Sequence, residues 1–177
     1  MMKIELSLLI VTLLSNHFSS GLEVVCPPRW TQWRGGCYRF INQPRKSWDD
    51  ARAACNTYEL SQRICPVQTA HLVSIDSQEE NNFLFNWWKE LREPVLRTTS
   101  QSFWTGLNDK DSEGNFKSVR GKPARYFNWM GGQPDNDGPN GEQNCVQVWK
   151  NSWNDEGKWD DMFCHAKLAF MCEFRCY

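Results

Sequence analysis

The segment from Gln133 to Cys145 is rich in side chains that can bind a metal ion through oxygen. It reads Gln-Pro-Asp-Asn-Asp-Gly-Pro-Asn-Gly-Glu-Gln-Asn-Cys and contains no large apolar residue. A second acidic pair, Asp160-Asp161, lies shortly before Cys164. Calcium takes about six to eight oxygen ligands from carboxylates, amide carbonyls and the backbone. The two segments together predict a calcium site assembled from separate parts of the chain.

Two other kinds of chemistry fit these residues less well. The chain has eight cysteines but no Cys-x-x-Cys pair, and its three histidines are isolated, which argues against zinc. A glycosidase could use Asp160 or Asp161 with Glu142, but its acid and its base need differently tuned environments. Carboxylates gathered on one cation are held ionised instead. We therefore predict no catalytic residues.

Charge and the N-terminus indicate the compartment and exclude some partners. The formal net charge is −1 with both signs scattered, so capture of nucleic acid or of an anionic membrane is not expected. Residues 1–21 combine a lysine, the apolar run Leu6–Leu14 and small residues, as in a secretory signal peptide. The run is too short to span a bilayer. We expect a secreted protein without a membrane anchor, its cysteines oxidised, whose residues 22–177 form one domain.

Two helices and several short strands are expected to position the acidic segments. Strands should flank the Gly35-Gly36 turn, with a Cys26–Cys37 bridge across the hairpin. Ser47 is a suitable N-cap for a first helix, with Asp49 and Asp50 in its first turn. Ser77 and Glu80 form a capping box for a second helix before Pro94. That helix carries a stripe that we interpret as core: Phe83, Leu84, Trp87, Trp88 and Leu91.

The remaining strands are expected at residues 71–75, 103–107, 145–149 and 170–174. Between Asn108 and Trp159 the sequence is rich in glycine, proline, asparagine and aspartate, with interleaved aromatic residues. A long loop of this kind inside a small domain is usually functional when it is anchored. We therefore place the binding function in this region.

The order of motifs along the chain resembles the C-type lectin-like domain family. The resemblance covers residues 26–174 and rests on the following motifs: Trp33-x-x-x-Cys37-Tyr38, Ser47-Trp48-x-x-Ala51-x-x-x-Cys55, Leu72-Val73-Ser74-Ile75, Phe103-Trp104-Thr105-Gly106-Leu107, Gln133-Pro134-Asp135, Trp159-Asp160-Asp161-x-x-Cys164 and Met171-Cys172-Glu173. It implies an α+β fold with two helices, two small antiparallel sheets and a long calcium-binding loop. It also implies disulfides Cys55–Cys172 and Cys145–Cys164, with Cys26–Cys37 marking the longer form of the domain.

Two cysteines, Cys65 and Cys176, fall outside the family pattern. Eight cysteines allow 105 pairings, so spacing alone does not choose among them. An intrachain Cys65–Cys176 bond is favoured, because each residue follows a cysteine of the Cys55–Cys172 bridge. An interchain bond through Cys176 is the alternative.

By resemblance, five residues hold the calcium ion: Gln133, Asp135, Gln143, Asp160 and Asp161. The Gln133–Pro134 bond should be cis. The triplet Trp153-Asn154-Asp155 copies a family motif, but the distance to the cysteine fits Trp159-Asp160-Asp161 instead. Gln143 and Asp160 depart from the common pattern in opposite ways, so three carboxylates and two amides still face the metal. For a possible second calcium site, Asp109 and Glu113 match the family's auxiliary ligand positions, whereas Asn136 and Asn144 stand where carboxylates are common.

The same resemblance implies a carbohydrate ligand whose two neighbouring hydroxyls coordinate the calcium. The residues expected to contact the sugar are Gln133, Asp135, Glu142, Gln143, Trp153 and Asp160. Gln-Pro-Asp is the galactose-type order, so galactose or N-acetylgalactosamine is predicted over mannose, although Gln143 and Asp160 reverse a second donor–acceptor pair. The alternative is a protein- or mineral-interaction domain in which calcium only braces the loop. A single site binds weakly, so a homo-oligomer is expected for avidity.

Overall fold

The computed structural model describes residues 25–59, 69–92, 102–138, 141–149 and 157–175. Two helices and eight strands lie within these ranges, which confirms the predicted α+β class. Their bounds are β1 Thr31–Trp33, β2 Gly36–Lys46, α1 Trp48–Cys55, β3 His71–Leu72, α2 Gln78–Arg92, β4 Ser102–Asn108, β5 Lys117–Ser118, β6 Cys145–Trp149, β7 Trp159–Met162 and β8 Leu168–Arg175. The predicted signal peptide lies outside the described residues.

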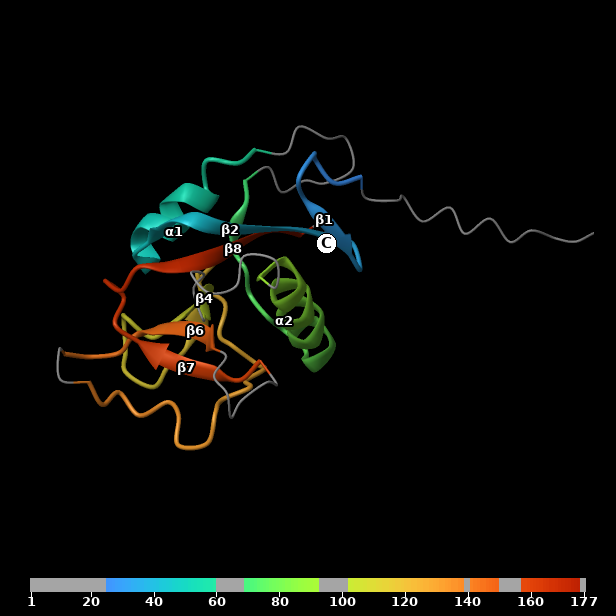
Figure 1. The fold of residues 1–177 in the computed structure, drawn as a ribbon. Coiled ribbons are helices and arrows are strands. Elements are labelled where there is room, and N and C mark those ends of the chain that lie inside the picture. Colours follow the sequence, from blue (N-terminus) through green and yellow to red (C-terminus); the bar gives the residue numbers. More distant parts are fainter. Residues whose placement is uncertain (1–24, 60–68, 93–101, 139–140, 150–156, 176–177) are drawn as a thin grey trace, which may run out of the picture.

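The strands form one sheet with the order β1-β2-β8-β4-β6-β7, with β3 added to β8 and β5 added to β4 (Figure 1). The sequence predicts two small antiparallel sheets, and both antiparallel ladders are present. A short parallel pairing between β4 and β8 joins them, with Phe103 opposite Ala169 and Trp104 opposite Phe170. Strand β6 is thus hydrogen-bonded to the central strand β4, and β7 is hydrogen-bonded to β6.

Both predicted helix starts are confirmed. Ser47 Oγ accepts a hydrogen bond from the Asp50 N–H at 3.3 Å, as an N-cap does. Ser77 Oγ accepts from the Glu80 N–H at 3.2 Å, and Glu80 reaches back to the Asp76 N–H at 3.0 Å. In a simple capping box the Glu80 carboxylate would accept from the N–H of Ser77. Here it accepts from the N–H of Asp76 instead, and it also accepts from the buried Tyr38 hydroxyl at 2.9 Å.

The apolar stripe of α2 is only partly core. Leu84 and Trp88 are buried, whereas Phe83 and Trp87 are partly exposed and Leu91 is 45 % exposed. Phe85, which the predicted stripe omits, is buried. The helix buries Leu84, Phe85 and Trp88 in the core, and Phe83 and Trp87 pack against it. Of the predicted stripe, Leu91 alone is an exposed apolar side chain among the described residues.

Three disulfides link the described segments. They are Cys26–Cys37, Cys55–Cys172 and Cys145–Cys164, as predicted. The Cys145–Cys164 bond ties β6 to the segment after β7, so it closes the base of the region that carries Asp160 and Asp161. Cys65 and Cys176 lie outside the described residues.

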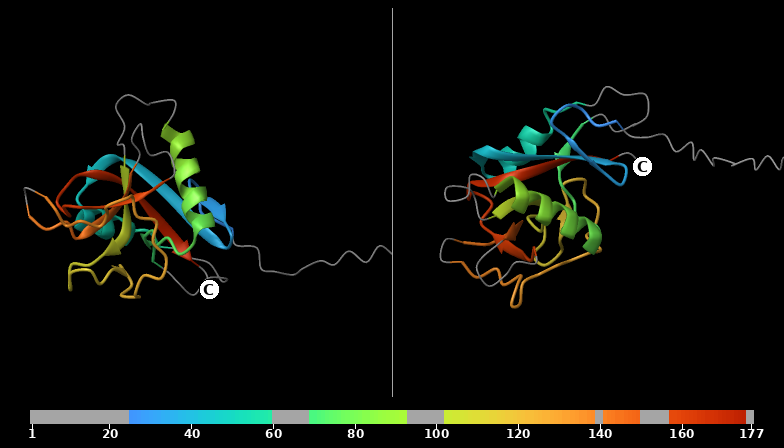
Figure 2. Two further views of the ribbon diagram at one scale, coloured as in Figure 1. Left: turned by 90° about the horizontal axis from the view of Figure 1, so that it is seen from below. Right: turned by 45° about the vertical axis from the view of Figure 1, so that its right-hand side comes forward.

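The long loop lies at the end of the molecule opposite β1, as the three views show (orange in Figures 1 and 2). The predicted strand at 71–75 is shorter than expected and covers only His71–Leu72. Strand β5 lies inside the segment that was expected to be loop, and it pairs with β4. Within the described residues, no helix has the length and apolar character needed to cross a membrane.

Candidate metal and carbohydrate site

The acidic loop begins at a cis peptide bond between Gln133 and Pro134, as predicted. The Gln133 side-chain amide donates to Asp135 Oδ2 at 3.1 Å, and the Asp135 N–H donates to Gln133 Oε1 at 3.1 Å. The two side chains therefore face one another across the proline. An amide and a carboxylate are presented side by side, with oxygen atoms from both available on one edge of the loop.

Asp161 joins this edge to strand β7. Its side chain is buried, and its two oxygens accept from the Asp135 N–H at 3.2 Å and the Asn136 N–H at 2.8 Å. These bonds span about 25 residues of sequence and place the two acidic segments against each other. The predicted meeting of the Gln-Pro-Asp loop with the Asp160-Asp161 pair is thus present in the structure.

Asp160 is held by a residue that the sequence analysis did not identify. Gln147, in β6, is buried and donates from Nε2 to Asp160 Oδ2 at 2.8 Å. Burial raises the pKa of the Asp160 carboxyl to about 6, against the lowering effect of this hydrogen bond, and the charges of Asp161 and Asp135 add to the rise. The sequence did contain a signal for this role of Gln147. A glutamine between two valines in a buried strand is a buried polar side chain, which needs a hydrogen-bond partner.

Gln143 is held by contacts within the acidic loop itself. Its N–H donates to Asn136 Oδ1 at 2.6 Å, and its side-chain nitrogen lies close to Gly138. Gly138 in turn rests on the ring of Phe163: a Cβ built on this glycine would lie 2.1 Å from the Phe163 ring. Phe163 follows β7 and is buried. The position of the loop is therefore set by direct contact with this aromatic ring.

The four residues of the predicted second metal site also lie in one region. Asn136 donates from Nδ2 to Glu113 Oε2 at 2.9 Å, and the Asp109 N–H donates to the backbone oxygen of Asn144 at 3.2 Å. One side-chain oxygen of Asp109 and one of Asn144 are buried without a hydrogen-bond partner among the described residues. Burial raises the pKa of Asp109, and the charges of Asp161 and Glu142 contribute to the rise.

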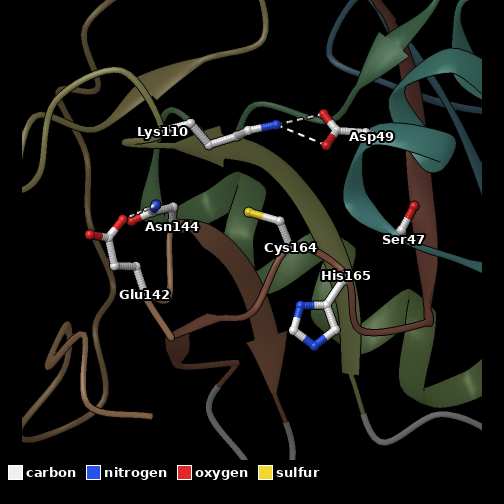
Figure 3. Close-up of a pocket in the computed structure, with 7 residues that line it drawn as sticks. All are labelled: Ser47, Asp49, Lys110, Glu142, Asn144, Cys164 and His165. Carbon is white, nitrogen blue, oxygen red and sulfur yellow. Dashed lines mark hydrogen bonds and ion pairs between the residues drawn. The ribbon is translucent and has the colours of Figure 1, made fainter. Parts of the chain in front are cut away.

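Among the described residues, the predicted sugar contact Glu142 has no hydrogen bond to a predicted ligand of the main site. Glu142 accepts a hydrogen bond from Asn144 Nδ2 at 3.2 Å and lines an open pocket of about 550 Å³ between the loop and α1. Figure 3 shows Glu142 and Asn144 on one side of this pocket, the Lys110–Asp49 ion pair across it, and His165 beside Cys164. Trp153 and the triplet Trp153-Asn154-Asp155 lie outside the described residues.

The donor set fits a hard, oxygen-preferring cation. All five predicted ligands of the main site carry side-chain oxygens. The charges of Asp161 and Asp135 raise the pKa of Asp160, and a bound cation would offset this repulsion between carboxylates. Among the described residues, no three His, Cys, Asp or Glu side chains form a group that could hold a metal ion unaided. Amide and backbone oxygens would have to complete the coordination, as the two glutamines of the set allow.

The chain belongs to the Lectin C-type domain family, which matches residues 44–174. The "Alpha-N-acetylgalactosamine-specific lectin" of Patiria pectinifera is 34 % identical over 152 residues, covering 84 % of this chain and 82 % of that protein. "Echinoidin" of Heliocidaris crassispina is 33 % identical over 123 residues, covering 70 % of this chain and 80 % of that protein.

Solved structures show the same fold. The C-type lectin CEL-I from Cucumaria echinata is 30 % identical and superposes with a TM-score of 0.70, over 86 % of this chain and 99 % of that one. Members of the family are carbohydrate-binding proteins and not enzymes, which confirms the prediction of a domain without catalysis.

Proposed function

We propose that this chain is a calcium-dependent lectin for galactose- or N-acetylgalactosamine-type glycans. The observation that carries the proposal is the pairing of Gln133 with Asp135 next to the buried Asp161. In a lectin domain these side chains would hold the calcium ion together with Gln143 and Asp160. The name of the Patiria pectinifera relative, which gives N-acetylgalactosamine as its ligand, supports the choice of sugar.

The loop residues would both hold the ion and orient the sugar. Bound calcium supplies positions at which two neighbouring sugar hydroxyls can coordinate. The Asp135 carboxylate accepts a hydrogen bond from one hydroxyl, and the Gln133 amide donates to its neighbouring oxygen. The hydrogen bond from Gln147 holds the Asp160 carboxylate in place to bind the ion and the sugar. The buried, unpaired oxygens of Asp109 and Asn144 fit a second calcium ion, with Glu113 and Asn136 beside them.

Binding to immobilised galactose and mannose, in calcium and in EDTA, tests the proposal. Asp135→Ala and Asp161→Ala should lose calcium-dependent binding, whereas the matched control Asp137→Ala, an exposed aspartate of the same loop, should keep it. If either site variant retains EDTA-sensitive binding, the ligand set is wrong. A wild-type protein that takes up calcium but binds no glycan would favour the protein- or mineral-contact alternative.

Sugar preference is tested separately by exchanging the donor and the acceptor. Gln133→Glu combined with Asp135→Asn restores the mannose-type order on this edge and should move preference towards mannose. An unchanged preference for galactose would show that Gln143 and Asp160 determine which sugar binds.

Secretion forms part of the same proposal. The three disulfides of the described segments require an oxidising compartment, and residues 1–21 have the composition of a leader. N-terminal sequencing of protein recovered from culture medium should give a first residue close to Leu22. A homo-oligomer, which would raise the avidity of a weak single site, is tested by sedimentation of the same material.

A further inference from the structure

A second surface of the molecule gathers positive charge beside the pocket of Figure 3. Between Gly114 and Pro134 the chain carries four basic and no acidic side chains. The fold places part of this segment, strand β5 and the turn after it, beside helix α1. The two segments enclose a cleft of about 250 Å³. Of these four, Lys117 lines the cleft, and the pairing of β5 with β4 places it opposite Asn108, two residues before Lys110.

Three cations and one carboxylate line this cleft: Arg52, Lys110, Lys117 and Asp111. Asn108, Ser118 and Trp48 also line the cleft and are largely buried. The Lys110 ammonium group lies 5.3 Å from the centre of the Trp48 ring, in a cation–π contact. The net charge of the lining is positive, although the whole chain carries a net charge of −1.

The cations are only partly neutralised by neighbouring acids. Lys110 pairs with Asp49 and Lys117 pairs with Asp111, but both aspartates stand out in solvent, with side chains 59 % and 71 % exposed. Arg52, in the last turn of α1, forms no ion pair with any described residue. The charged groups that line the cleft therefore keep a net positive charge.

Lys110 separates this cleft from the pocket of Figure 3, and the two hollows differ in charge. The pocket of Figure 3 places the carboxylates of Asp49 and Glu142 against the single cation of Lys110. An anion is favoured on the side of Lys110 that faces Arg52 and Lys117, and it is repelled on the other side.

We propose that the cleft between α1 and β5 binds an anionic saccharide, through sulfate or carboxylate groups on Arg52, Lys110 and Lys117, without calcium. Guanidinium and ammonium groups form charge-assisted hydrogen bonds with such oxyanions. A single-stranded nucleic acid fits less well, because the cleft has no exposed aromatic ring among its described lining residues on which bases could stack.

The test measures binding of a heparin hexasaccharide by calorimetry, in EDTA so that the calcium loop takes no part. Arg52→Gln and Lys117→Gln should each weaken binding about two- to fivefold, as expected for partly exposed ion pairs. Asp111→Asn should strengthen it, because it removes the acid that competes for Lys117. Arg34→Gln, in the turn between β1 and β2, makes the same change of charge outside the cleft and should have no effect.

Added sodium chloride should weaken wild-type binding, since exposed charges are screened. A hexasaccharide stripped of its sulfates but retaining its carboxylates identifies the group that is bound, and either result supports an anionic saccharide. The proposal is overturned if the wild-type protein does not bind, if Arg52→Gln and Lys117→Gln bind as tightly as wild type, or if binding is lost in EDTA. Equal affinity for oligothymidine of the same charge also overturns it. None of these results depends on calcium-dependent sugar binding.

Discussion

A single hydrogen bond fixes the orientation of the Asp160 carboxylate. Gln147 donates it from a buried position in the neighbouring strand, and Asp160 is paired directly opposite Gln147 in the sheet. A carboxylate with one oxygen already occupied presents the other oxygen outwards in a fixed direction. Removing a partner that orients a metal ligand typically costs 10–100-fold in metal affinity.

We therefore expect Gln147→Ala to weaken calcium binding about tenfold, with a smaller change in stability in EDTA. Calorimetric titration of calcium into the oxidised protein measures this. Gln32→Ala, an exposed glutamine of strand β1, is the matched control and should bind calcium as wild type does. Unchanged affinity in Gln147→Ala would mean that Asp160 does not contribute to the metal site.

Glu173 and Glu80 are both buried beside the guanidinium group of Arg175. Arg175 Nε donates to Glu173 at 2.6 Å, and the Ser74 N–H donates to its other oxygen at 3.1 Å. Two carboxylates share this one cation, since Arg175 also pairs with Glu80. Burial raises the pKa of Glu173 from 4.5 to about 7, although Arg175 and the Ser74 N–H lower it and Glu80 raises it further.

The folded protein therefore holds a proton on Glu173 at a pH where the unfolded chain has lost it. The stability that this group contributes is full below about pH 4.5 and is lost as the pH rises through about 7. In EDTA, the Tm difference between wild type and Glu173→Gln should move in favour of wild type on going from pH 7 to pH 5, by on the order of 5 °C. A pH-independent difference would contradict the assignment.

At the level of elements, the loop is positioned by its contact with the segment after β7. Gly138 has no room for a side chain, because Phe163 lies where a Cβ would be. Gly138→Ala should displace the loop and weaken calcium binding by roughly tenfold, since overpacking costs about 1–3 kcal/mol. Gly131→Ala introduces its methyl group where no atom lies within 4 Å and should be neutral. Calcium titration of both variants measures this, and equal affinities would show that Phe163 does not support the loop.

The elements that sequence patterns predicted are those with local signals. Helix starts at Ser47 and Ser77 follow from capping residues, and the strand at Cys145–Trp149 follows from a short, mainly apolar run. Strand β5 has only two residues and no pattern of its own, and it exists because β4 offers it a partner. The α2 stripe was overextended at Leu91, because helical spacing identifies an apolar face but does not show where the packed core ends.

In the site, as in the fold, the parts that could be predicted are those carried by short motifs. The Gln133–Asp135 edge and the Asp160-Asp161 pair are carried by short motifs, and both are brought together as expected. The roles of Gln147 and Phe163 depend on which strands are neighbours and on which face their side chains occupy. The cluster around Arg52 and Lys117 arises in the same way, from segments that only the folded chain brings together.

For the whole molecule, the question is whether calcium stabilises the entire domain or only its loop. Strand β7 lies at the edge of the sheet, where it could detach with the loop. However, Trp159 of this strand is buried, donates to Asn81 of α2 at 2.7 Å, and packs edge-to-face against Tyr126 and Trp129. Asp160 and Asp161 follow Trp159 directly, so ligand binding at these residues is coupled to the core that joins the sheet to α2.

We therefore expect calcium to raise the single unfolding transition of the domain and not merely to protect the loop. Calcium at 100 times its Kd would add about 2.7 kcal/mol, and a domain of this size gains roughly 2–4 °C of Tm for each kcal/mol. Differential scanning calorimetry should then show a rise of about 5–10 °C over EDTA. Magnesium should give a much smaller rise, because it dehydrates reluctantly and needs near-octahedral geometry. Protection of the loop from proteolysis by calcium without any change in Tm would show that β7 and the loop unfold separately from the core.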